Sequence, residues 1–254
     1  SYLLVTQVTE GGGNVYVWIF ISILVGMFVG LVAGFANGAI IAGIGVTPIL
    51  ATLATLTLYN GIAVGLRNGQ SITGLPEEFV AIGNSLLFGI PMPMVILLVA
   101  AVGVAIYINR TGLGMQSVLV GANETAAHYS AIGVKKVLYM TYALSGGLSA
   151  LAGLIIASRS ASANPDYGAS YVLLAIVIVV LGGVNPYGGF GTVTGVVLAT
   201  VVLQMVSSGF NALRFSQFFY QLAQGFVLIA VMVLNTYLDR RRLKAKKDKV
   251  AKES

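Results

Sequence analysis

The chain has 254 residues, of which 57% are hydrophobic and only 9% are charged, and its mean hydropathy is +0.91. Soluble domains carry about 25% charged residues, so this composition excludes a water-soluble globular protein and predicts an integral membrane protein. The chain has no cysteine, which excludes a disulfide framework and thiolate chemistry, and its net charge of +6 is concentrated at the C-terminal end.

The first long apolar stretch runs from residue 11 to residue 66 without a charged side chain. It predicts two membrane spans, at about 16–36 and 40–66, with a turn at Asn37 and Gly38. Glycines recur every four residues along the first span and let another helix backbone approach that face closely. These are Gly26, Gly30, Gly34 and Gly38.

The second predicted span carries polar but uncharged side chains. At 100° per residue, Thr52, Thr55 and Tyr59 fall within about 60° of one another, and Asn60 follows directly. Such a face should be turned toward other helices or toward a water-filled path rather than toward lipid. Interhelical hydrogen bonding and a solute path both explain it.

Two polar connections are assigned to the outer side of the membrane. Residues 67–89 predict an irregular loop whose two acidic residues outnumber its single basic residue, and residues 158–169 predict a second connection of this kind. Spans are predicted at about 90–108 and at 137–157.

The only sizeable polar interruption far from the ends is the segment 110–136. Arg110, Lys135 and Lys136 lie at its ends, and short loops rich in basic residues are retained on the cytoplasmic side. The segment is longer than the two to eight residues that usually join neighbouring helices. We therefore expect another protein to bind it.

The middle of this segment, GANETAAHYSAIGV, predicts a short helix that Asn123 or Thr125 caps and Gly133 ends. Its small-residue surface suits a partner protein docking from the cytoplasm, and this surface comprises Ala126, Ala127, Ser130 and Ala131. A helix lying on lipid headgroups is the alternative, and it would need bulky apolar anchors and a basic face.

The apolar run at 170–210 is broken by the string GGVNPYGGFG. Its first part, Tyr171 to Leu181, would rise only about 16 Å as a helix, which is short of a full crossing. We predict either two short spans or a re-entrant pair, because broken helices at membrane depth occur where protein or a cavity surrounds them. The structural glycines of this break are Gly182, Gly183, Gly188, Gly189 and Gly191.

A last span is predicted at about 217–238, and its amides can join helices or bind hydroxyl groups. These amides are Gln217, Gln221 and Gln224. The basic tail at 239–254 indicates a cytoplasmic anchor near anionic lipid rather than a nucleic-acid site. The fold class is thus an all-α polytopic bundle with about seven crossings in one membrane domain, residues 1–238.

Charged residues outside the tail fall in predicted loops or at span ends, which argues against a proton-driven carrier. The single histidine, His128, lies in the polar segment without a cysteine or a second histidine, so neither a metal ligand nor a catalytic base is expected there. The chain is not expected to be an enzyme.

The string GANETAAHYSAIGV is similar to the cytoplasmic coupling segment in permease subunits of bacterial ABC importers for ribose-type sugars and autoinducer-2. Further similarity lies at 37–63, 74–79 and 168–195, and the most specific stretch is LGGVNPYGGFG, from Leu181 to Gly191. Many family members carry a Glu-Leu pair where this chain has Val172 and Leu173, so the substrate stays open. The resemblance implies the coupling residues Gly121, Asn123, Glu124, Ala126, Ala127, Ser130, Ile132 and Gly133.

The same resemblance implies a bacterial inner-membrane protein with a cytoplasmic C-terminus, preceded by about three further N-terminal spans. Implied partners are an ATP-binding subunit that holds ATP and magnesium, a second permease copy or paralogue, an extracytoplasmic solute-binding protein and membrane lipid, without nucleic acid. No cofactor is implied for the chain itself. Two alternatives remain: a self-sufficient secondary carrier or facilitator, and a branched-chain amino-acid ABC permease.

Overall fold

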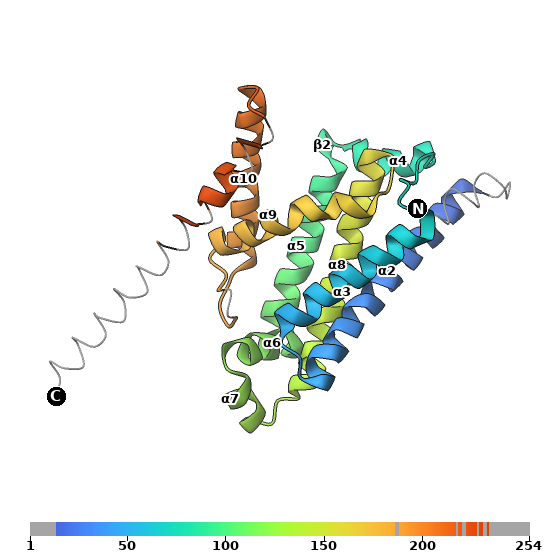
Figure 1. Ribbon diagram of the computed structural model, residues 1–254. Helices are drawn as coiled ribbons and strands as arrows, with labels where there is room; N and C mark the ends of the chain where they lie inside the picture. The colour runs from blue at the N-terminus through green and yellow to red at the C-terminus, as the bar shows by residue number, and fades with distance from the viewer. Residues whose placement is uncertain are drawn as a thin grey trace. The chain divides into compact units, whose positions relative to one another are not determined.

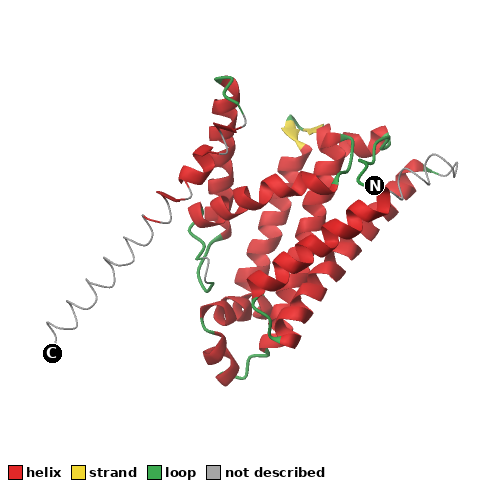
Figure 2. Ribbon diagram, viewed as in Figure 1, coloured by secondary structure: helices red, strands yellow, loops and turns green. Residues whose placement is uncertain are grey.

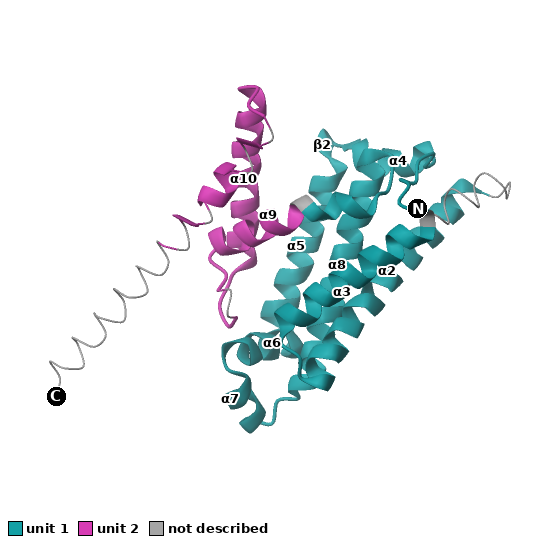
Figure 3. Cartoon of the chain, in the orientation of Figure 1, with its two compact units in different colours: residues 1–170 teal, residues 171–254 magenta. Residues whose placement is uncertain are grey.

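The computed structural model describes residues 14–233, except 186–187, 217, 220–221, 228 and 231–232. The predicted basic tail and the end of the predicted last span lie outside the described residues. Helices dominate, which confirms the all-α polytopic class (Figures 1 and 2). The chain divides into two compact units, residues 1–170 and 171–254 (Figure 3).

Five helices among the described residues are long and apolar enough to cross a membrane. Four belong to the first unit and one to the second, and they span Val15–Ile44, Pro48–Leu66, Met92–Arg110, Val134–Ser160 and Val193–Ala212. The count of about seven crossings therefore stays a prediction.

The first helix, α2 (Val15–Ala39), continues into a π-helical turn, η1 (Ile40–Ile44), before α3 (Pro48–Arg67) begins. The predicted turn at Asn37 and Gly38 is wrong, because both residues are helical. The break comes later, at Gly45, whose φ of 84° lies in the left-handed region. Glycine ends a helix well in that conformation, and Pro48 is suited to the first turn of the next helix.

Helix α2 packs closely against α8 (Val134–Ser160) along Gly26, Gly30, Gly34 and Gly38, which we call the glycine ladder. A Cβ atom on Gly30 would collide with the Cβ atom of Ala150, and a Cβ atom on Gly34 would collide with the carbonyl oxygen of Tyr142. Gly146 lies opposite both glycines on α8. Only glycine therefore allows the two backbones to lie this close.

The connection after α3 is more regular than predicted. It contains α4 (Glu77–Asn84) and a hairpin of β1 (Leu86–Leu87) and β2 (Ile90–Pro91), which leads into α5 (Met92–Arg110). The Ser158 hydroxyl near the end of α8 fixes α4, because it donates to the Phe79 carbonyl at 2.5 Å and accepts from the Gly83 amide at 2.7 Å. The prediction of an irregular loop here is therefore wrong for residues 77–84.

The two connections assigned to the outer side meet in the structure. Backbone hydrogen bonds of 2.9 Å join Ile72 and Ala163 in both directions, and the Asn164 side chain donates to the Ser71 hydroxyl at 2.8 Å. Within the first unit, α4 lies at the same end as this bridge, whereas α6 (Gly112–Ala122) and α7 (Glu124–Tyr129) lie at the opposite end (Figure 1). The unit thus has two distinct ends, each formed by segments that connect the long helices.

A single 3₁₀ turn, η2 (Pro165–Gly168), leads into α9 (Ala169–Leu181), which is followed in the second unit by α10 (Val193–Ala212). The 20 residues of α10 rise about 30 Å, so the prediction that both parts of this run are short is wrong for the second part. The break itself lies between the two helices. There, the Gly182 carbonyl oxygen lies against Gly195, where a side chain would collide.

Candidate coupling segment and polar groove

The segment 110–136 is folded into two helices, α6 and α7, and the sequence predicted only the second. Helix α6 turns back sharply from α5, because Gly114 lies against the Tyr107 carbonyl oxygen and leaves no room for a Cβ atom. The Thr111 hydroxyl caps α6 by accepting from the Gly114 amide at 3.0 Å. This segment is therefore an ordered element rather than a simple connection.

Helix α7 is short and capped at both ends. Asn123 caps its start by accepting from the Ala126 amide at 2.9 Å, which confirms Asn123 as the cap. Its end differs from the prediction, since α7 ends at Tyr129 and the Ser130 amide bonds to the Ala126 carbonyl at 3.1 Å. Gly133 instead lies immediately before α8.

A buried apolar cluster supports α7 from beneath. Ala127 is 4% exposed and packs with Val120 of α6 and with Val134 and Val137 of α8. The prediction that Ala127 lies on the exposed docking surface is therefore wrong. Its small side chain instead points inward and contacts residues of α6 and of the start of α8.

The remaining predicted coupling residues lie above this cluster. Ile132 is half-buried and packs against the cluster, while the others are exposed: Gly121, Asn123, Glu124, Ala126, Ser130 and Gly133. Tyr129, which the sequence interpretation did not single out, is 87% exposed at the end of α7. An aromatic side chain inside a predicted water-facing segment was the available signal, because tyrosine is enriched at energetically important interface positions.

A second feature is a groove of about 530 Å³ between α2, α3 and α8, which we call the polar groove. Three of the predicted path residues line it, namely Thr52, Thr55 and Tyr59. Asn60 does not line it, Gln224 is buried in the second unit, and Gln217 and Gln221 lie outside the described residues. The groove also contains polar residues that the sequence interpretation missed: Asn37, Tyr142, Ser145 and Ser149.

The hydrogen bonding of the side chains that line the groove is incomplete. The hydroxyl groups of Thr52 and Thr55 donate to carbonyls one turn earlier in α3, at 2.8 Å to Pro48 and 3.1 Å to Ala51. The Tyr59 hydroxyl crosses to α2 and donates to the Ala33 carbonyl at 3.2 Å. The buried Oδ1 atom of Asn37, by contrast, has no hydrogen-bond partner among the described residues.

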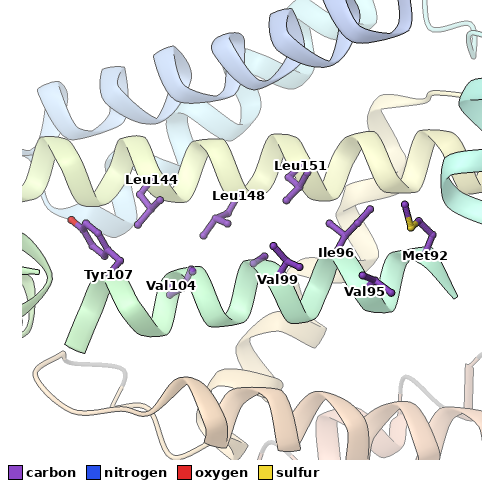
Figure 4. Close-up of a pocket in the computed structure, with 11 residues that line it drawn as sticks. Met92, Val95, Ile96, Val99, Val104, Tyr107, Leu144, Leu148 and Leu151 are labelled. Atoms are coloured by element: carbon purple, nitrogen blue, oxygen red, sulfur yellow. The ribbon is translucent and has the colours of Figure 1, made fainter. Parts of the chain in front are cut away.

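A third feature is an apolar cavity of about 460 Å³ between α5 and α8, which Figure 4 shows with its lining side chains turned toward one another. Leu144, Leu148 and Leu151 of α8 form one wall, and side chains such as Val99 of α5 form the other. Its side chains offer hydrogen-bonding groups only at Tyr107. The described residues hold no cluster of three or more metal-ligating side chains.

Together, the apolar spans and the neutral groove between them define a polytopic helical membrane protein. A family model described as the branched-chain amino acid transport system permease component matches residues 1–234. The chain belongs to this family.

Individual relatives are import permeases. The ribose import permease protein RbsC of Bacillus subtilis is 37% identical over 78% of this chain and 62% of its own length. The RbsC protein of Haemophilus influenzae is 36% identical over 89% of this chain and 71% of its own length. The autoinducer 2 import system permease protein LsrD of Photorhabdus temperata is 33% identical, covering 85% and 67%.

The chain therefore spans only about two thirds of the length of these relatives, 62% for the first of them. No solved structure matches the chain.

Proposed function

We propose that the chain is the membrane-spanning permease subunit of an ATP-driven importer for a sugar or a related neutral hydroxylated solute. The observation that carries this proposal is the structure of the segment 110–136. Its exposed residues lie over a buried apolar cluster, and Val134 and Val137 of this cluster belong to α8. An ATP-binding subunit docks on this surface and holds the ATP and magnesium. Movement of the segment is then transmitted to the groove by α8, because α8 contributes residues to the buried cluster and to the lining of the groove.

The proposed docking residues are the exposed ones, with Tyr129 added to them: Gly121, Asn123, Glu124, Ala126, Ser130 and Gly133. Ala127 and Ile132 act from beneath by holding α7 in place. This end of the unit and the C-terminus face the cytoplasm in the proposal. The basic residues Arg110, Lys135 and Lys136 beside the docking surface support that orientation.

The proposed path for the solute follows the face of α3 that carries Thr52, Thr55 and Tyr59. Its neutral side chains suit an uncharged hydroxylated solute, and the relatives, which are ribose and autoinducer 2 import permeases, support this class. The complete importer in this proposal includes a second permease copy or paralogue, surrounding lipid and an extracytoplasmic solute-binding protein.

The family description favours a second candidate, a permease for branched-chain amino acids. Such a solute carries a carboxylate and an ammonium group at neutral pH, and the lining of the polar groove contains no charged side chain to pair with either. A facilitator that works alone is a third candidate. A facilitator needs no partner protein, so this candidate does not explain why a buried cluster holds α7 in place.

Docking is tested by an arginine at an exposed position of α7, Ala126→Arg, in the complex of permease and ATP-binding subunit. The fold of the segment should survive, because Ala126 is exposed, whereas the bulky charge should reduce the co-purified ATP-binding subunit about tenfold or more. The matched control is Asn84→Arg on α4, which is exposed at the opposite end of the unit and should leave co-purification unchanged.

Unchanged co-purification and ATP-dependent uptake in the Ala126→Arg variant would refute docking at this surface. Ala127→Arg is unsuited to this test, because a charge at a 4% exposed position would disrupt α7 itself. Solute accumulation by the permease alone, without an ATP-binding subunit, would favour the carrier instead.

A further inference from the structure

The hairpin between α4 and α5 exposes an unbroken run of apolar residues. Residues 86–91 read LLFGIP, and every one of them is exposed. Leu86 is 67% exposed, and Phe88 at the tip of the hairpin is 97% exposed. Exposed apolar side chains that lie together mark a surface for another protein or for a membrane.

The apolar side chains lie on both faces of the hairpin. The antiparallel register pairs Leu86 with Pro91 and Leu87 with Ile90. Successive residues of a strand point to opposite faces, so each face carries one of these apolar pairs. A protein that covered one face would leave the other face in water. Fluid lipid surrounds both faces at once, so the pattern favours lipid over a protein partner.

The length of α5 places the hairpin at the surface of the membrane. The helix has 19 residues and ends with the polar pair Asn109 and Arg110. Its apolar part, residues 92–108, rises only about 25 Å, which is less than the hydrocarbon thickness of about 30 Å. The hairpin adjoins the other end of this part without a linker, because β2 ends at Pro91 and α5 begins at Met92. It therefore extends the apolar length of α5 at that end.

The backbone of the hairpin excludes a position deep in the hydrocarbon. In the described part of the chain it forms a sheet of only two strands, so the backbone groups along its outer edges have no neighbouring strand. Open sheet edges do not occur where lipid tails surround them, whereas water and headgroups can satisfy such groups at the membrane surface. The preceding helix, α4, also begins with two exposed acidic residues, Glu77 and Glu78. Apolar side chains with polar edges fit the boundary between headgroups and acyl chains.

The residue at the tip is unusual for its position. Phe88 and Gly89 are the two central residues of the turn, and both have a positive φ, 52° and 82°. Such a turn favours asparagine, aspartate or glycine at its first central position, and a bulky side chain there is an outlier. The requirements of the turn therefore do not explain phenylalanine, and at 97% exposure neither does packing. Insertion of an aromatic ring into the membrane surface does explain it.

We propose that the hairpin is a membrane anchor, in which Phe88 inserts among the lipids at the boundary of headgroups and acyl chains and holds the adjoining end of α5 at that depth. Its partner is the phospholipid surface at the end of the first unit that carries α4 (Figure 1). Because the Ser158 hydroxyl bonds α4 to α8, the anchor also sets the depth of α4. Such an anchor requires only that α5 crosses a membrane, so it is independent of how the chain drives or admits a solute.

The absence of cysteine from the chain allows a single nitroxide label to report on each face of the hairpin. Leu86→Cys and Leu87→Cys place the label on opposite faces, and the full chain is reconstituted in phosphatidylcholine vesicles. Electron paramagnetic resonance then measures collisions with oxygen, which concentrates in lipid, and with a water-soluble nickel chelate. We expect both labels to collide mainly with oxygen. A label at Glu78→Cys on α4 is the control in water and should collide mainly with the nickel chelate.

The role of Phe88 is tested with the label at Leu87→Cys. Phe88→Asn creates the Asn-Gly pair that this turn favours, so the hairpin should be preserved while the apolar tip is lost. We expect the ratio of oxygen to nickel collisions to fall severalfold, toward the value at Glu78. Phe88→Trp is the matched control, because tryptophan is enriched at membrane surfaces, and it should leave the ratio unchanged.

Three results would overturn the proposal. A label that collides mainly with the nickel chelate, at either face, would place that face in water. A label that both reagents reach poorly would show that protein covers the face, whether from a partner or from another part of the permease. An unchanged ratio in the Phe88→Asn variant would show that the tip does not hold the hairpin in the membrane.

Discussion

The apolar cavity and the polar groove lie against the same helix, α8, and differ in polarity rather than in size. Their volumes are about 460 and 530 Å³. Each uses its own stripe of α8 residues, spaced by three, four or seven positions so that a stripe stays on one face. The apolar stripe is Leu144, Leu148 and Leu151, and the polar stripe is Tyr142, Ser145 and Ser149.

The comparison shows which of the two spaces offers hydrogen bonds to an occupant. An apolar cavity can stay empty or admit a lipid chain, since its walls have few hydrogen bonds to satisfy. The polar groove, by contrast, is lined by the hydroxyl groups of Thr52, Ser145 and Ser149, which can hydrogen-bond to water or to a solute. Volume alone would rank the two spaces as equals, whereas polarity makes the groove the better match to the proposed solute path.

The largest effect is expected from a charge in the apolar cavity. Leu148 lies near the middle of α8, so Leu148→Lys places an ammonium group without a polar partner at membrane depth. The cost of insertion for such a residue is about 2.5–3.5 kcal/mol, and the amount of protein in the membrane should fall severalfold. Alkaline extraction of membranes followed by immunoblotting measures this amount.

The control is Leu148→Met, which preserves the volume and should insert normally. Normal insertion and normal function of Leu148→Lys would contradict the assignment of this cavity as apolar, because the ammonium group would then have to be hydrated. The cavity between α5 and α8 would in that case be the aqueous space.

A smaller effect is expected at the glycine contact that borders the polar groove. A Cβ atom on Gly146 would collide with the Gly30 carbonyl and lie 2.8 Å from the Gly34 Cα atom, so Gly146→Ala should force α2 and α8 apart. We expect a loss of about 1–3 kcal/mol in the free energy of unfolding, as for other overpacked contacts. Thermal unfolding of the purified chain in one detergent gives the measurement.

Gly153, on the same helix, is a matched control, because a Cβ atom there would meet no neighbouring atom within 4 Å. Gly153→Ala should therefore stabilise α8 by up to about 1 kcal/mol, the usual gain when alanine replaces a helical glycine. If both alanine variants shift the unfolding temperature in the same direction, the close contact does not hold the groove in shape.

The sequence predicted the long elements well, because membrane spans are determined by length and hydrophobicity. The spans expected at 90–108 and 137–157 correspond to Met92–Arg110 and Val134–Ser160. The glycine ladder predicted that the first helix makes a close contact but not which helix it contacts. Its partners on α8, Gly146 and Ala150, could be recognised only from the structure. The polar face of α3 was also visible as a pattern, although its two explanations could not be separated.

Most of the residues that line the polar groove, and the burial of Ala127, could not be predicted from the sequence. The pair Asn37-Gly38 is typical of turns, yet packing against α8 keeps both residues helical, and so Asn37 was missed. Helix α7 has only six residues, too few for a periodic pattern to show which alanine is buried. The Ser158 contact with α4 joins residues about 75 positions apart, and a single sequence contains no signal for such a pair.

The smallest effects should come from shortening one side chain on each stripe. Leu148→Ala removes dispersion contacts from a half-buried side chain beside an existing cavity, so we expect a loss of about 1 kcal/mol in unfolding free energy, below the loss in a fully packed core. Ser145→Ala should stay within about 0.5 kcal/mol, because the Ser145 hydroxyl makes no hydrogen bond within the described part of the chain. Thermal unfolding in the same detergent compares the two. A loss for Ser145→Ala as large as that for Leu148→Ala would mean that the polar stripe holds helices together, and the groove would then be a structural contact rather than a space kept for a ligand.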